Sequence, residues 1–204
     1  MKYLSLHTET TGLDRDLDQV IEIGAIIEDT NNPLPFDEIP KFHAIVKHDR
    51  YSGGAYAINM NARVFKILAE RVKIRNVEEK YEFDFRNNIC SQELVALYMY
   101  SWMVDNLMMT SPHWTWKDAI TVTVAGKNIA AFDMPFLNRL PEFKKLFRFR
   151  HRMIDPATLY WNPMLDTELP SLEQCLERAG LPSEVVHDAV QDAWQVVQVL
   201  RKKY

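Results

Sequence analysis

Carboxylates and histidines that could hold a metal ion occur in three short groups, far apart along this chain of 204 residues. In the first group, Glu9 stands two residues after His7 at the end of an apolar segment. Side chains alternate between the faces of a strand, so we expect these two on the same face. Asp133 lies where a buried strand passes into a helix, and His187 and Asp192 lie where a loop enters the last helix. Hard divalent cations prefer oxygen ligands, so these groups would make a metal site if the fold brings them together.

The elements that must position these groups are indicated by the spacing of apolar residues. Strands are predicted over residues 2–6, 20–27, 42–46, 119–125 and 153–155. The segment 20–27 is almost continuously apolar, which indicates burial on both faces. Helices are predicted over residues 61–72, 92–108, 130–140, 171–179 and 188–203. Three strands followed by helix-rich sequence favour a mixed sheet whose first half is antiparallel.

Polar residues supply the expected starts of several helices. Ser91 and Asp188 are predicted N-caps, and Ser171 opens a capping-box pattern. Residues 73–88 are charged and irregular, and we predict a loop there. No repeat, low-complexity tract or linker divides the sequence, so one domain is expected over residues 1–204.

The three groups lie within longer motifs that resemble those of the DEDDh branch of the DEDD exonuclease superfamily. The motifs are Thr-Glu-Thr-Thr-Gly-Leu at 8–13, Asn-x3-Phe-Asp-x2-Phe-Leu at 128–137, and His-Asp-Ala-x2-Asp-Ala at 187–193. The five-residue step within the third motif is typical of this branch. The alternative y branch carries a Tyr four residues before the final Asp, where this chain has Asp188.

The resemblance covers nearly the whole chain, and the branch includes the proofreading subunit of bacterial DNA polymerase III and ribonuclease T. It implies an α/β, ribonuclease H-like fold with a five-stranded mixed sheet flanked by helices. It also implies a metal-dependent 3′–5′ exonuclease that releases nucleoside 5′-monophosphates from the 3′ end of single-stranded DNA or RNA. The choice between DNA and RNA stays open, because no residue can be assigned to the 2′-hydroxyl.

The resemblance also implies a role for each chemical group. Glu9 and Asp192 would hold one Mg²⁺ or Mn²⁺ ion that activates a water, and Asp133 would support a second ion. The residue at position 7 would bridge the two ions. His187 would be the general base, because the ordinary pKa of imidazole, about 6.5, lies near working pH. Two such ions supply the nucleophile and neutralise the phosphate.

His7 departs from the pattern, since the family has Asp at this position. An imidazole can ligate Mn²⁺ or Zn²⁺ through one nitrogen, but it is a poor ligand for Mg²⁺ and cannot bridge two ions. We therefore expect the chain to bind a metal pair weakly and to be inactive or greatly slowed.

Two origins of this histidine are open. It is either a substitution in an active nuclease or the mark of a natural pseudo-enzyme that binds nucleic acid without cleaving it. The retention of the other ligands and of His187 favours the first. A structural relative without any nucleic-acid role is disfavoured by the three nearly intact motifs.

Residues next to the motifs are candidates for contact with the terminal nucleotide. They are Thr10, Thr11, Gly12, Leu13, Asn128 and Phe132. Packing within the fold is an equally good explanation for Leu13 and Phe132 and a better one for Asn128. Glu22 and Asp155 are expected to support the fold, Glu22 as an outer-shell residue at most and Asp155 as a turn residue after a strand.

Residues 144–152 form the densest basic run, with aromatic residues between the charges. Such a pattern suits single-stranded nucleic acid through phosphate contacts and base stacking. The alternative, which we favour, is a solvated segment whose phenylalanines enter the core.

Composition narrows the class of protein. A net charge of −4 disfavours a broad electrostatic grip on duplex DNA, although it does not exclude a nucleic-acid enzyme. Cys90 and Cys175 make no disulfide framework and are expected as small buried residues in a reducing compartment. No signal segment or membrane-spanning run is apparent, so a soluble cytoplasmic protein without a membrane partner is expected. Homodimers through residues 98–102 or 114–116 are a further option, with core packing favoured for both.

Overall fold

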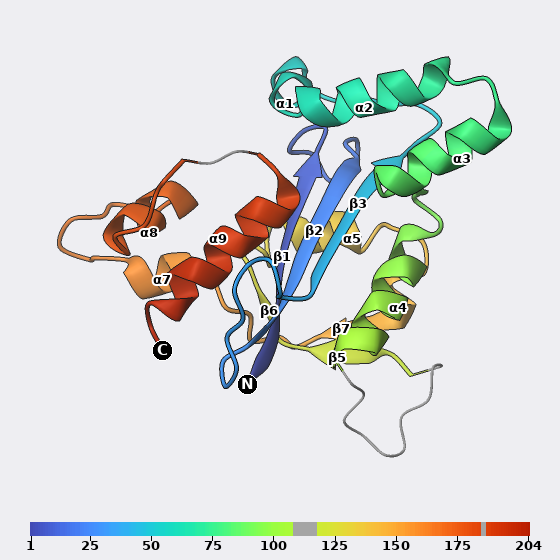
Figure 1. Ribbon diagram of the computed structural model, residues 1–204. Coiled ribbons are helices and arrows are strands. Elements are labelled where there is room, and N and C mark those ends of the chain that lie inside the picture. Colours follow the sequence, from blue (N-terminus) through green and yellow to red (C-terminus); the bar gives the residue numbers. More distant parts are fainter. Residues whose placement is uncertain (108–117, 185–186) are drawn as a thin grey trace.

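A mixed sheet forms the centre of the molecule in the computed structural model, which describes residues 1–107, 118–184 and 187–204 (Figure 1). Within these ranges the sheet has five strands in the order β4-β3-β2-β1-β6. The strands are β1 (Lys2–Thr10), β2 (Val20–Asp29), β3 (Lys41–Lys47), β4 (Ile89–Ser91) and β6 (Val124–Ala125). β1, β2 and β3 are antiparallel neighbours, while β4 runs parallel to β3 and β6 runs parallel to β1. The predicted α/β class with a five-stranded mixed sheet is confirmed.

β2 is buried on both faces, as its continuous apolar sequence predicts. Ile23 packs in the core on one face, and Ile26 packs in a separate cluster on the other. β1 continues four residues beyond its predicted end, because its pairing with β2 extends as far as Thr10 opposite Val20. The register shifts between Glu9, which lies opposite Glu22, and Thr10, so the strand is irregular at its last residue.

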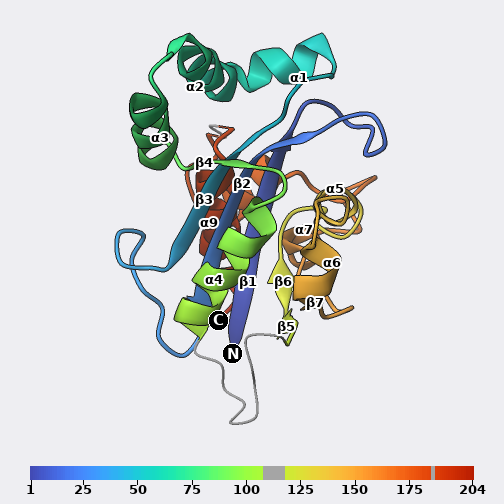
Figure 2. The same cartoon turned by 90° about the vertical axis from the view of Figure 1, so that its right-hand side faces the viewer.

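Helices cover both faces of the sheet. α4 (Val95–Leu107) packs on one face through the fully buried Met99 and Met103. The same core receives side chains from α5 (Asp133–Leu137) and α6 (Phe143–Leu146). α9 (Ala189–Arg201) packs on the opposite face, so that the sheet lies between α4 and α9 (Figure 2).

The remaining helices lie at the edges of this core. α7 (Pro156–Tyr160) and α8 (Leu172–Arg178) pack beside α9. α1 (Ala55–Met60), α2 (Ala62–Lys73) and α3 (Val77–Arg86) lie across the end of the sheet at which β1 ends (Figure 1). α1 therefore lies over the end of β1 that carries His7 and Glu9.

Two predictions are wrong, one of a loop and one of a helix cap. Residues 73–88 are not a loop, because α3 forms there. Asn76 caps it by accepting a hydrogen bond from the Glu79 backbone N–H, and two glutamates occupy its first turn. Ser91 does not cap a helix: it ends β4, and α4 begins only at Val95. The predicted caps Ser171 and Asp188 are confirmed.

The predicted strand over residues 119–125 is split. β5 (Ile120–Val122) pairs in parallel with β7 (Phe147–Phe149), and within the described residues these two strands form a separate sheet. β6 joins the main sheet. The strand predicted at 153–155 is reduced to one bridge between Ala125 and Ile154. The helix predicted at 130–140 is shortened to α5.

Other expectations concern cysteines, membranes and dimers. Cys90 and Cys175 are buried free thiols, as predicted. None of the helices in the described ranges has the length and apolar character needed to cross a membrane. Tyr98 on α4 is half exposed, at 52%, and residues 114–116 lie outside the described residues, so homodimer formation stays a prediction. The cytoplasmic location also stays a prediction.

Candidate metal and nucleic-acid site

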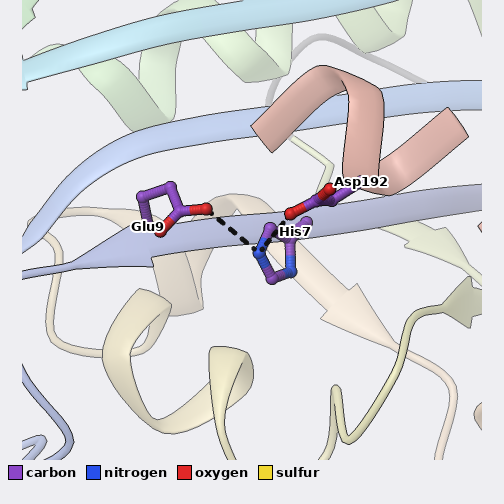
Figure 3. Close-up of side chains that lie close together, drawn as sticks. All are labelled: His7, Glu9 and Asp192. Carbon is purple, nitrogen blue, oxygen red and sulfur yellow. Dashed lines mark ion pairs between the residues drawn. The ribbon is translucent and has the colours of Figure 1, made fainter. Parts of the chain in front are cut away.

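Strand alternation places His7 and Glu9 on one face of β1, as predicted. His7 Nε2 lies 3.6 Å from Glu9 Oε1. The same nitrogen lies 3.5 Å from Asp192 Oδ2, although Asp192 comes from the first turn of α9 at the other end of the chain. Figure 3 shows the dashed lines from Glu9 and from Asp192 meeting at the same nitrogen of the His7 imidazole.

The start of α9 is held against the sheet by backbone contact. A Cβ built on Gly24 of β2 would lie 2.1 Å from the carbonyl carbon of Ala189, so a larger residue cannot stand there. Ser5 Oγ donates a 2.7 Å hydrogen bond to the Ala193 carbonyl oxygen. These contacts bring Asp192 to His7 and Glu9 on β1.

Asp133 joins the group from the first residue of α5. Its Oδ1 accepts hydrogen bonds of 2.8 Å from both the backbone N–H and the hydroxyl of Thr8. His7 Nδ1 lies 3.7 Å from the same oxygen. The two ring nitrogens of His7 therefore face different carboxylates, with Asp133 on one side and Glu9 and Asp192 on the other.

The electrostatics of the site follow from burying these groups together. Burial opposes protonation of His7, but Glu9, Asp133 and Asp192 outweigh it and raise the pKa of the imidazole to about 9. Burial raises the pKa of the Asp192 carboxyl to about 6, despite the nearby His7. Burial also raises the pKa of Asp133. At neutral pH an imidazolium thus stands among the carboxylates, where a metal pair would place its ions.

Two carboxylate oxygens at the site retain unused acceptor capacity. Glu9 Oε1 and Asp192 Oδ1 are buried and have no hydrogen-bond partner within the part of the chain that the structure describes. Buried carboxylate oxygens normally have partners, so this donor set fits a cation. A bridged pair of Mg²⁺ ions does not fit it, because the bridging position is an imidazole.

A cavity of about 370 Å³ opens beside these groups. Of the residues predicted to contact substrate, Thr10, Gly12, Leu13 and Phe132 line it. Leu13 is 85% exposed, whereas Phe132 is partly buried and also packs against the core. His187 lines the same cavity, with a left-handed φ of 51° immediately before α9.

The other two predicted contact residues are not among those that line the cavity. The Thr11 side chain accepts a hydrogen bond from the Gln19 N–H, and its carbonyl oxygen accepts one from Gly54. Asn128 has a left-handed φ of 55°, and its N–H donates to Asp155 Oδ2. Both residues hold turns, and their contact with substrate stays a prediction.

Several residues of the cavity wall were not predicted from the sequence. Tyr56 on α1 is 79% exposed and lines the cavity, and Asn61 beside it donates to the Thr10 carbonyl oxygen at 3.2 Å. Lys127 and Leu172 complete other parts of the wall. No motif marks Tyr56 or Asn61, because only the placement of α1 over the end of β1 brings them to the site.

Glu22 belongs to a supporting network next to Glu9. It is fully buried on β2, and its two carboxylate oxygens accept hydrogen bonds of 2.6 and 2.7 Å from Arg63 Nη2. His43 Nε2 makes a further hydrogen bond of 2.6 Å with Glu22 Oε1. Arg63 also lies 3.2 Å from Asp188, the N-cap of α9. Arg63 thereby ties α2 to β2 and to the segment that carries His187, and this role was not foreseen.

The basic run at 144–152 packs as the favoured alternative predicts. Phe147 is buried and Phe149 packs against the same core. Lys144, Lys145 and Arg148 are exposed. Their contact with nucleic acid stays a prediction.

No protein-family model matches the sequence, and no curated protein matches it. Solved structures do match. E. coli exonuclease I in complex with a 5cy-dT13 oligonucleotide has a TM-score of 0.58 and 15% identity, over 98% of this chain and 40% of that chain. Cell-death related nuclease 4 (CRN-4) has a TM-score of 0.59 and 15% identity, over 98% and 62%. Exonuclease I from Methylocaldum szegediense has a TM-score of 0.57 and 15% identity, over 98% and 40%.

These similarities establish the fold. The chain has the ribonuclease H-like α/β architecture that the sequence predicts. It spans about two fifths of the length of the exonuclease I chains and less than two thirds of CRN-4.

Proposed function

We propose that this chain is a nuclease domain that hydrolyses single-stranded nucleic acid from its 3′ end and releases nucleoside 5′-monophosphates. We further propose that His7 leaves it slowed or inactive. One observation carries the proposal: Glu9, Asp133 and Asp192 come from distant segments and meet beside a cavity that His187 also lines. Mere packing of the fold gives no reason to bury three carboxylates together.

The reaction is assigned to the His7→Asp variant, in which all four ligand positions would be carboxylates. Two Mg²⁺ or Mn²⁺ ions, when bound there, supply a nucleophilic hydroxide and neutralise charge on the phosphate. Glu9, Asp133 and Asp192 would hold them. His187, which lines the cavity, would take the proton of the attacking water.

The apolar wall of the cavity supports a single-stranded substrate. Leu13 and Tyr56 are both highly exposed beside the metal ligands, and Phe132 adds a second ring. Exposed apolar and aromatic side chains bind unstacked bases in preference to a closed duplex. The exonuclease I structure that this chain resembles contains a single-stranded oligonucleotide, which is consistent with this substrate class.

A second candidate function is a binding module that holds nucleic acid without cleaving it. His7 favours it, because an imidazole cannot bridge two ions. The two functions differ in their response to chelator: a binding module should hold an oligonucleotide equally well with and without it, whereas a nuclease site should bind more tightly with metal.

The experiment is the His7→Asp variant incubated with end-labelled single-stranded and duplex DNA and RNA, in Mg²⁺ or Mn²⁺. We expect release of 5′-monophosphates from 3′ ends, at least about 100-fold faster than with the His7 chain. His7→Asp combined with Asp192→Asn is the matched control and should be inactive. If His7→Asp cleaves none of the substrates, the nuclease proposal is wrong.

A further inference from the structure

We propose that His7, Glu9 and Asp192 form a site for one borderline divalent ion, represented by Zn²⁺, in place of a pair of Mg²⁺ ions. The ligand atoms would be His7 Nε2, Glu9 Oε1 and a carboxylate oxygen of Asp192. The inference concerns the chain with His7 in place and requires no hydrolysis, so it goes beyond the proposed function.

The spacing of the ligand atoms fits one small ion. One atom from each of the three residues can be chosen so that all lie within 4.8 Å of one another. His7 Nε2 lies 3.6 Å from Glu9 Oε1 and 3.5 Å from Asp192 Oδ2. Tetrahedral ligands at about 2.1 Å from Zn²⁺ are about 3.4 Å apart, whereas adjacent octahedral ligands of Mg²⁺ are about 3.0 Å apart. The observed spacing is nearer to the tetrahedral value.

The unpartnered carboxylate oxygens point independently to a cation. Glu9 is 6% exposed and Asp192 is 3% exposed. Their atoms Oε1 and Oδ1 accept no hydrogen bond from any residue in the described ranges. Glu9 Oε1 is also the oxygen that faces His7 Nε2. An ion bound between His7 Nε2 and Glu9 Oε1 would satisfy that glutamate oxygen, which is otherwise costly to bury.

Asp133 has a different task in this site, because it faces the other nitrogen of the imidazole. His7 Nδ1 lies 3.7 Å from Asp133 Oδ1, and the two hydrogen bonds from Thr8 fix that oxygen. Metal-ligating histidines commonly direct their second nitrogen at a carboxylate, which fixes the tautomer and the orientation of the ring. Asp133 is therefore a positioning residue for His7 and not a metal ligand.

The site leaves one coordination position open. Three protein ligands leave a fourth position of a tetrahedral ion, and all three residues line the 370 Å³ cavity. Imidazole nitrogen suits Zn²⁺ and is a poor partner for Mg²⁺, so the change at position 7 alters both the number and the kind of ion.

The test measures metal binding by calorimetry on the chelator-stripped chain, with Zn²⁺, Mn²⁺ and Mg²⁺ in turn. We expect one Zn²⁺ per chain, bound at least about tenfold more tightly than Mg²⁺. His7→Ala and Glu9→Gln should each weaken Zn²⁺ binding, and Asp133→Asn should weaken it by about 10- to 100-fold. His151→Ala, which removes an exposed histidine, is the control for binding at the surface and should change nothing.

Two further measurements keep the outcome clear. Thermal unfolding of each variant establishes that it is folded, and Co²⁺ substituted for Zn²⁺ should give the visible spectrum of a four-coordinate ion. Equal Zn²⁺ affinity in the chain and in His7→Ala, or a preference for Mg²⁺, would overturn the inference. Neither result depends on cleavage. If the chain binds Zn²⁺ as expected but the His7→Asp variant cleaves no substrate, only the proposed function is contradicted.

Discussion

Gly24 of β2 and Ala189 of α9 meet backbone to backbone, with no space for a side chain between them. This contact sets the distance of α9 from the sheet, and thereby the position of Asp192 relative to His7. His7 and Asp192, which are far apart in the sequence, are thus aligned by a glycine that has no side chain.

The first prediction concerns this contact. Gly24→Ala places a methyl group about where the Ala189 backbone lies, so we expect a loss of about 1–3 kcal/mol in the free energy of unfolding and weaker Zn²⁺ binding. Urea unfolding measures the first effect. Gly54→Ala is the matched control, because a Cβ there meets no atom within 4 Å and should change stability by less than about 0.5 kcal/mol.

The second prediction concerns the pH dependence of stability without metal. The pKa of His7 is raised from 6.5 to about 9 in the folded chain. Its charge therefore stabilises the fold fully below pH 6.5, and this stabilisation is lost as the pH rises through 9. Relative to His7→Gln, the chain should lose up to about 3 kcal/mol over this range, at about 1.4 kcal/mol per pKa unit. Parallel pH profiles of the two proteins would contradict it.

The third prediction concerns the response of His7→Asp to metal. This change replaces an imidazolium by a fourth carboxylate, so we expect a lower Tm than that of the His7 chain in chelator. Mg²⁺ should then raise the Tm of the variant more than that of the His7 chain. At a Mg²⁺ concentration of about 100 times its Kd for the variant, the free energy of unfolding of the variant should increase by about 2.7 kcal/mol. Differential scanning calorimetry measures both, and an equal response to Mg²⁺ would show that position 7 does not govern binding.

The fourth prediction concerns Arg63. Its removal takes two hydrogen bonds and the guanidinium charge from the fully buried Glu22 carboxylate, so Arg63→Ala should destabilise the chain by about 2–4 kcal/mol. The stability of Arg63→Lys should lie between that of the unchanged chain and that of Arg63→Ala. A lysine keeps the positive charge, but its ammonium group cannot make the planar contact of a guanidinium. Lys66→Ala, an exposed position on the same helix, is the control. Equal unfolding free energies for Arg63→Ala and Lys66→Ala would exclude a structural role for the network.

The fifth prediction concerns Tyr56 and rests on the proposed function. Its ring is 79% exposed in the cavity wall, so Tyr56→Ala should leave stability nearly unchanged. Loss of one stacked base should weaken binding of a single-stranded oligonucleotide by about 1–3 kcal/mol, measured by fluorescence anisotropy. Tyr81→Ala on α3, a ring of similar exposure outside that cavity, should bind normally. Equal affinity of the two variants would remove Tyr56 from the substrate site.

The central strands, and the placement of His7 and Glu9 on one face of β1, could be predicted because their signals are local. The apolar run at 20–27 requires a buried strand, and the alternation of His7 and Glu9 follows from strand geometry. The capping residues Ser171 and Asp188 marked the starts of α8 and α9 in the same way.

Features that depend on long-range packing were not visible in the sequence. α3 contains no fully buried residue, so its sequence shows no clear apolar periodicity by which the helix could be predicted. The break at Thr123 separates β5 from β6 because the two find partners in different sheets. Tyr56 and Arg63 acquire their positions only from the placement of α1 and α2 over the sheet.

The hydrogen bond between Ser5 and Ala193 spans 188 residues of sequence. Contacts of such separation are among the slowest to form, because a long loop must close before they contribute. During synthesis, β1 and the rest of the sheet emerge long before α9. A site that combines His7 with Asp192 is therefore incomplete until α9 docks on the sheet, so any chemistry of these groups requires that docking.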